Sequence, residues 1–165
     1  MLSVVMLTGL AVVACVLAAA TAVGLWRRRT DGRMRPVADS AAAAPAPALT
    51  PDEIGTALGD RATFVQFSTA FCAPCRTTRA LLGQVAGELG GVVHAEIDAE
   101  HHLDLVRRLD VTRTPTVLVL DAHGTVVKRA TGIPRRQDAL AAVALAAAGA
   151  SGTGASGTEA SGVGA

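Results

Sequence analysis

Residues 4–26 carry no charge and consist almost entirely of Val, Leu, Ala, Met and Gly. As a helix, this run is about 34 Å long at roughly 1.5 Å per residue, which is enough to cross a hydrocarbon core of about 30 Å. Trp26 stands where an interfacial aromatic side chain is expected. We therefore predict that residues 1–26 form an N-terminal transmembrane helix.

This segment has two alternative interpretations, a cleaved signal peptide and a lipoprotein anchor. A cleaved signal peptide calls for a basic start and a shorter apolar core, and Met1-Leu2-Ser3 has no basic side chain. Cys15 follows residues that loosely resemble a lipoprotein cleavage site, but the apolar run continues beyond it, so we interpret Cys15 as a small buried hydrophobe. Five arginines follow the helix: Arg27, Arg28, Arg29, Arg33 and Arg35. The positive-inside rule then predicts a single-pass protein of the cell membrane with its folded domain in the cytoplasm, an extracytoplasmic domain being the alternative.

Composition leaves one folded unit in the rest of the chain. Residues 27–49 are basic and then rich in Ala and Pro, which predicts a linker, and residues 149–165 are nearly all Gly, Ala, Ser and Thr, which predicts a disordered tail. Residues 50–148 remain as the domain. The 15 basic and 14 acidic residues of the chain nearly balance. No basic surface for nucleic acid is therefore expected, and we predict no nucleic-acid partner.

The domain shows an alternation of strand and helix patterns. Thr50-Pro51-Asp52-Glu53 has the composition of a capped helix start, and Gly59 can end that short helix. After it come predicted strands over 62–68, 92–97, 116–120 and 125–130, and predicted helices from Pro74 to Gly90, over 101–109 and over 135–148. The order β-α-β-α-β-β-α predicts an α/β fold with a central mixed sheet flanked by helices, preceded by one transmembrane helix.

Cys72 and Cys75 lie where the first strand turns into a helix, in Cys72-Ala73-Pro74-Cys75. A CxxC pair can be a redox couple, half of a zinc site or a coincidence. Unpaired N–H groups and the positive end of the helix dipole stabilise a thiolate at this position, and Pro74 suits a first helical turn. Cys72 can then attack a disulfide, and Cys75 can resolve the mixed disulfide that forms.

A metal site is the less favoured use of the two thiols. Zinc needs a closed set of ligands, and no second cysteine pair stands at a familiar spacing. The four histidines are scattered over a strand, a helix and a turn: His94, His101, His102 and His123. We predict no metal and no cofactor. The alternative that stays open is a soft metal ion bound by the two thiols alone.

Phe71-Cys72-Ala73-Pro74-Cys75-Arg76 after a buried strand resembles the active-site segment of the thioredoxin family, and Val111-Thr112-Arg113-Thr114-Pro115-Thr116 resembles its cis-proline segment. Gly132 matches the family's glycine near the substrate groove. The resemblance covers residues 50–148, and with the N-terminal helix it extends to membrane-anchored bacterial thioredoxin-like proteins. It implies a thioredoxin-like fold for the domain.

The resemblance also implies roles for individual residues. Pro115 would be cis and face the cysteines, and the backbone of Thr114 would hydrogen-bond an extended substrate segment. Phe71, Pro74 and Gly132 would shape the groove that positions the substrate. An ordinary loop proline before a strand is the other interpretation of Pro115.

Two departures from the family bear on the proton that the resolving cysteine must lose. Gln66 stands where thioredoxins carry a buried Asp, and His94 stands where they carry a nearby Lys. Gln cannot exchange a proton, so the usual route is missing. We consider Gln66 and His94 a possible proton relay, with an exposed or simply hydrogen-bonded His94 as the alternative.

Together these features predict a membrane-anchored thiol–disulfide oxidoreductase, a protein-disulfide reductase that contributes to cell redox homeostasis. Its partners would be disulfide-containing protein substrates and an upstream thiol or membrane electron donor. A non-catalytic module that binds an extended protein segment or a soft metal ion is the alternative.

Overall fold

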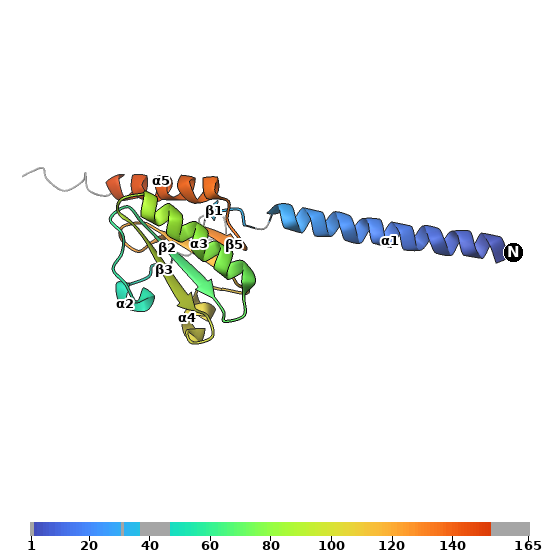
Figure 1. Cartoon of the computed structure of the whole chain (residues 1–165), viewed down its shortest axis with the longest axis horizontal. Helices are drawn as coiled ribbons and strands as arrows, with labels where there is room; N and C mark the ends of the chain where they lie inside the picture. Colours follow the sequence, from blue (N-terminus) through green and yellow to red (C-terminus); the bar gives the residue numbers. More distant parts are fainter. Residues whose placement is uncertain (1, 31, 37–46, 153–165) are drawn as a thin grey trace, which may run out of the picture. The chain divides into compact units, whose positions relative to one another are not determined.

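A computed structural model describes residues 2–30, 32–36 and 47–152, and the chain divides into two units, residues 1–31 and 32–165. The first unit is one helix, α1 (Leu2–Thr30; Figure 1). Its segment Gly9–Trp26 has a mean hydropathy of 2.2, and its side chains are exposed. By length and composition this helix can cross a membrane, a test that an N-terminal signal sequence also passes.

The second unit is built on a five-stranded mixed sheet in the order β1-β5-β4-β2-β3. The strands are β1 (Arg35–Pro36), β2 (Ala62–Ser68), β3 (Val92–Asp98), β4 (Thr116–Leu120) and β5 (Val126–Thr131). β2 lies inside the sheet, parallel to β3 and antiparallel to β4. All of its residues are buried, which explains its nearly continuous apolar sequence. The predicted thioredoxin-like α/β order is confirmed.

Helices cover both faces of this sheet (Figure 1). One face packs against α3 (Ala73–Glu88) and α5 (Arg136–Gly152) around Phe64, and the other packs against α2 (Pro51–Ile54) and α4 (Leu103–Arg108) around Phe67. Successive residues of a strand point to opposite faces. Gln66 and Ser68 therefore share the face of Phe64, the face that α3 covers.

The first helix of the domain starts as predicted but ends earlier. The Thr50 hydroxyl accepts from the Glu53 N–H, and the Glu53 carboxylate accepts from the Thr50 N–H at 2.9 Å, which completes the capping box. The helix stops at Ile54 because Gly55 takes a left-handed conformation (φ 71°) and donates its N–H to the Pro51 carbonyl. Gly59, the predicted end, lies outside this helix.

Part of the predicted linker belongs to the sheet. β1 pairs antiparallel with β5 through Arg35 and Pro36, and Ala48 bridges Thr125 farther along the same edge. Residues 37–46 of the linker and 153–165 of the predicted tail lie outside the described residues. α5 continues to Gly152, beyond the predicted start of the tail at residue 149.

Candidate active site

Cys72 and Cys75 form a disulfide at the start of α3. Cys72 is the N-cap residue, and the Cys75 N–H lies 3.1 Å from the Cys72 sulfur. Pro74 stands in the first turn, where its missing N–H leaves no helical hydrogen bond unmade. The backbone donor that now faces the Cys72 sulfur stabilises a thiolate there once the disulfide is reduced.

The two sulfur-bearing residues differ in exposure. Cys75 is only 2% exposed, whereas Cys72 is partly exposed and Phe71 before it is fully exposed. An incoming partner therefore reaches Cys72 first, beside an apolar ring. Cys75 faces the sheet and the polar side chains under it.

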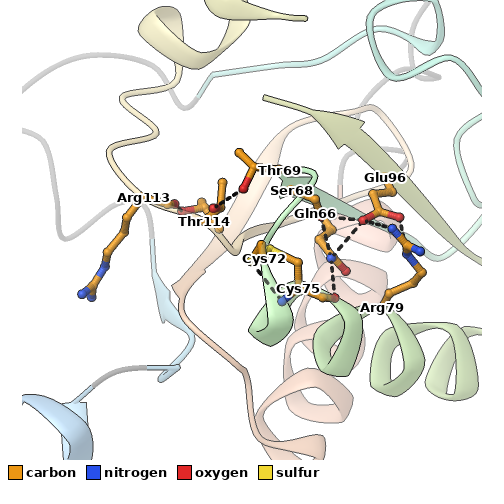
Figure 2. The surroundings of a disulfide bond; sticks show 10 residues. Gln66, Ser68, Thr69, Cys72, Cys75, Arg79, Glu96, Arg113 and Thr114 are labelled. Atoms are coloured by element: carbon orange, nitrogen blue, oxygen red, sulfur yellow. Dashed lines mark hydrogen bonds and ion pairs between the residues drawn. A yellow bond between two sulfur atoms is a disulfide. The ribbon is translucent and has the colours of Figure 1, made fainter. Parts of the chain in front are cut away.

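The second loop predicted to join the site lies next to the cysteine loop (Figure 2). The Thr114–Pro115 bond is cis, as the resemblance implied, and the Pro115 carbonyl accepts from the Gly132 N–H at 2.8 Å. Thr69 connects the two loops: its hydroxyl lies 3.3 Å from that of Thr114, and its carbonyl accepts from the Cys72 N–H. The structure thus brings together the cysteine pair, Thr114–Pro115 and Gly132.

Gln66 is fully buried directly beneath the disulfide. The Cys75 carbonyl can only accept a hydrogen bond, so the Gln66 amide nitrogen faces it at 3.0 Å. The same nitrogen lies 2.8 Å from the Ser68 hydroxyl and 3.4 Å from Glu96 Oε1. Figure 2 shows Gln66 between Cys75 and Glu96. Gln66 therefore links the backbone of Cys75 to a carboxylate on the neighbouring strand.

His94 donates to this network from the other side. The Gln66 amide oxygen lies 3.2 Å from His94 Nε2, and because that oxygen only accepts, the ring nitrogen must carry the hydrogen. Burial lowers the pKa of His94 below its ordinary value of 6.5, the Glu96 charge opposing this effect and the Arg79 charge adding to it. Gln66 and a neutral His94 are hydrogen-bonded to each other, as the proposed relay required, but Gln66 separates the ring from the sulfurs.

Glu96 is the carboxylate that contacts Gln66. It accepts from the Ser68 hydroxyl at 2.5 Å and from Arg79 Nη2 at 2.7 Å. Burial acts to raise the pKa of the Glu96 carboxyl, but the hydrogen bonds from Arg79 and Ser68 outweigh it, and the pKa lies below its ordinary value of 4.5. Glu96 belongs to β3, an edge strand of the sheet, and its side chain is 23% exposed.

A cavity of about 380 Å³, which we call the disulfide cavity, opens beside the cysteines. It is lined by Ser68, Thr69, Ala70, Cys72, Cys75, Arg76, Arg79, Glu96 and Asp98. Within residues 2–30, 32–36 and 47–152, no group of three or more His, Cys, Asp or Glu side chains is arranged to hold a metal ion.

Sequence comparison matches residues 49–146 to the thioredoxin family. The chain belongs to the thioredoxin family. It is 37% identical over 79 residues to the mitochondrial thioredoxin of Bos taurus, covering 47% of this chain and 46% of that protein. It is 29% identical over 68 residues to thioredoxin of Mycoplasma genitalium, covering 41% and 66%. The match thus spans about half the length of the mitochondrial relative. The crystal structure of spinach chloroplast thioredoxin f, short form, superposes with a TM-score of 0.47 at 25% identity, covering 53% of this chain and 78% of that one.

Within this thioredoxin domain, Ser68, Thr69, Arg79 and Glu96 were missed by the sequence analysis. The pairing of the predicted strands could have identified Glu96. A parallel β2–β3 pair puts Gln66 opposite Glu96, so the two side chains share a face. Arg79 had no such signal, since its ion pair with Glu96 depends on how α3 packs over the sheet.

Proposed function

We propose that this protein is a membrane-anchored thiol–disulfide oxidoreductase that reduces disulfides in protein substrates. The observation that carries the proposal is the Cys72–Cys75 disulfide at the start of α3, in a chain of the thioredoxin family. The sulfurs are unequal, since Cys75 is buried and Cys72 is partly exposed. This inequality suits one attacking and one resolving cysteine.

The cycle starts when a donor dithiol gives two electrons and two protons to the Cys72–Cys75 disulfide and becomes a disulfide itself. The Cys72 thiolate then attacks a substrate disulfide, forms a mixed disulfide and releases one substrate thiolate, which takes up a proton. Cys75 loses its proton and attacks the Cys72 sulfur. The internal disulfide forms again, and the second substrate sulfur leaves as a thiol.

Thr114, Pro115, Phe71, Pro74 and Gly132 are proposed to position the substrate. Phe71 is fully exposed beside Cys72, and the Thr114 hydroxyl is held by that of Thr69. The Thr114–Pro115 bond is cis, and the Gly132 N–H donates to the Pro115 carbonyl at 2.8 Å. An extended segment of a protein substrate can add its backbone along this surface.

The apolar side chains of Gly9–Trp26 are exposed along α1, which supports a membrane span for this helix. The arginines that follow Trp26 support a domain on the cytoplasmic side, where the compartment favours reduction. An upstream thiol would then supply the electrons. If the domain lies on the extracytoplasmic side, a membrane electron donor would supply the electrons instead.

Substituting the resolving cysteine tests the proposal. In the full chain, Cys75→Ser should accumulate mixed disulfides with protein substrates, because the second attack is blocked while the first proceeds. Non-reducing gels with mass spectrometry of the trapped species measure this. Cys72→Ser is the matched control and should trap nothing, whereas Cys15→Ser should leave trapping unchanged.

The reduction potential of the Cys72–Cys75 couple decides the direction of the reaction. A value near about −270 mV suits a reductase, and one above about −180 mV suits an oxidant or isomerase. Equilibration with dithiothreitol, with thiols counted, measures it. If Cys75→Ser traps no partner and the wild-type couple does not cycle, the chain is a non-catalytic binding module for an extended segment or a soft metal ion, and the proposal is wrong.

A further inference from the structure

Three side chains beneath the disulfide form a chain of hydrogen bonds that ends at one carboxylate. His94 Nε2 donates to the Gln66 amide oxygen, and the Gln66 amide nitrogen donates to the Ser68 hydroxyl at 2.8 Å. The Ser68 hydroxyl has one hydrogen, and it points at Glu96 Oε1, because a carboxylate accepts only. Glu96 is therefore the acceptor end of a chain that starts at His94.

The same carboxylate lies close to the resolving cysteine. Glu96 Oε1 and the Cys75 carbonyl oxygen contact one atom, the Gln66 amide nitrogen, at 3.4 and 3.0 Å. A single amide group thus separates the carboxylate from the Cys75 backbone. Cys75 and Glu96 also line the disulfide cavity, whose volume of about 380 Å³ and polar lining are sufficient for water.

No other group under the disulfide is placed to take a proton from Cys75. Gln66 does not titrate, and His94 directs its hydrogen at Gln66. Asp98 lines the cavity as well, but its side chain is more exposed, at 43%, and its hydrogen bonds are with Glu100 and His101 rather than with the chain that contacts Cys75. Among the residues that the structure describes, this leaves Glu96.

We propose that Glu96 accepts the proton of Cys75, through water in the disulfide cavity, when Cys75 attacks the mixed disulfide. The inference rests on the oxidoreductase function proposed above. The Cys75 S–H bond breaks, the proton passes through water to the Glu96 carboxylate, and the Cys75 sulfur forms its bond to Cys72. The substrate sulfur leaves as a thiolate. Glu96, whose side chain is 23% exposed, returns the proton to bulk water, from which the leaving thiolate takes one up.

The charged groups around Glu96 keep it ready to accept. Arg79 and Arg76 reach the cavity from α3, and His94 and Asp98 belong to β3, while β2 brings only the uncharged Gln66 and Ser68. Arg79 holds the pKa of the carboxyl below its ordinary value, so Glu96 is ionised at neutral pH. A base of low pKa is a modest one, so a contribution below the usual range of about 10²–10⁴ is expected.

The test is the rate at which the mixed disulfide resolves in the full chain. With reduced protein and one equivalent of a disulfide-linked peptide, Glu96→Gln should slow this step about tenfold at pH 7. The rate should then rise about tenfold per pH unit, as hydroxide replaces the lost base. Added formate should restore much of the rate in Glu96→Gln and none in wild type, because the small carboxylate can enter the cavity.

Glu88→Gln is the matched control. Like Glu96, Glu88 is a carboxylate paired with an arginine, Arg136, but it lies on α3, at the end of that helix away from the cysteines. In Glu88→Gln, the mixed disulfide should resolve at the wild-type rate. An unchanged or faster rate in Glu96→Gln, or a slow rate that formate does not restore, would overturn the inference about Glu96. If wild type forms no mixed disulfide at all, the proposed function fails instead.

Discussion

His94 is half-buried beside Gln66, and burial lowers its pKa below 6.5. The unfolded chain therefore binds a proton at this residue more readily than the folded chain does. Stability from this residue is fully present above pH 6.5 and is lost as the pH falls toward the folded pKa. The loss cannot exceed about 1.4 kcal/mol per pH unit for one proton, and partial exposure reduces it.

We expect His94→Gln to weaken this dependence. The new amide can still donate to Gln66 but does not titrate. Chemical denaturation at pH 7 and pH 5.5 should show a smaller drop in the free energy of unfolding for the variant than for wild type. Glu53, Glu96 and Asp98 have lowered pKa values too, but their ordinary values of 4.5 and 3.8 place their effects below this window. Equal drops in both proteins would show that His94 does not couple folding to pH.

The residue scale also shows what the sequence could and could not predict in the site. The cysteines and Pro115 stand out because each has a chemical or backbone property that few residues share. Gln66 and His94 were singled out only by comparison with the family pattern. Nothing in the sequence distinguishes Glu96 from an ordinary surface glutamate. Only its pairing opposite Gln66 and its contacts with Ser68 and Arg79 place it in the site.

At the scale of elements, sequence prediction worked where a segment is fixed by its own composition. β2 and β4 begin and end at the predicted residues, because both are runs of buried side chains bounded by polar or turn residues. β1 could not be found in this way. It is an Arg-Pro pair with exposed side chains, and only the free edge of β5 makes it a strand.

Gly32 helps to hold residues 32–36 against β5, and substituting it tests this pairing. Its N–H donates to the Thr131 carbonyl at 2.7 Å, and its φ is 78°. A Cβ at this position would collide with the Ile133 carbonyl oxygen. We expect Gly32→Ala to release residues 32–36 from β5, at a cost of about 1–2 kcal/mol for the left-handed conformation alone.

Amide hydrogen exchange measures this release, with faster exchange expected at Gly32 and at the paired residues of β5. Gly83→Ala is the control, because the space around Gly83 on α3 is open. That variant should stabilise the helix by up to about 1 kcal/mol and leave exchange at β5 unchanged. Protection at Gly32 that survives the substitution would show that the edge pairing does not need glycine there.

At the scale of the whole molecule, the chain joins an exposed apolar helix to a domain whose disulfide needs an electron source. If the helix anchors the chain as proposed, the side of the membrane on which the domain lies decides which electron source can reach it. The arginine cluster after Trp26 favours the cytoplasmic side. The assignment therefore depends on charges that can be changed without touching the site.

Labelling of Cys72 in cells tests the assignment. In a Cys15→Ser/Cys75→Ser chain treated with a permeant reductant, a membrane-impermeant maleimide should label Cys72 only after lysis, because the charge rule places the domain inside. Replacing Arg27, Arg28 and Arg29 by Glu should raise labelling of intact cells, since the retained charge bias is weakened. The intact mass controls for removal of residues 1–26. Strong labelling of Cys72 in intact cells, in the chain that keeps its arginines, would place the domain outside. A membrane electron donor would then be the required partner.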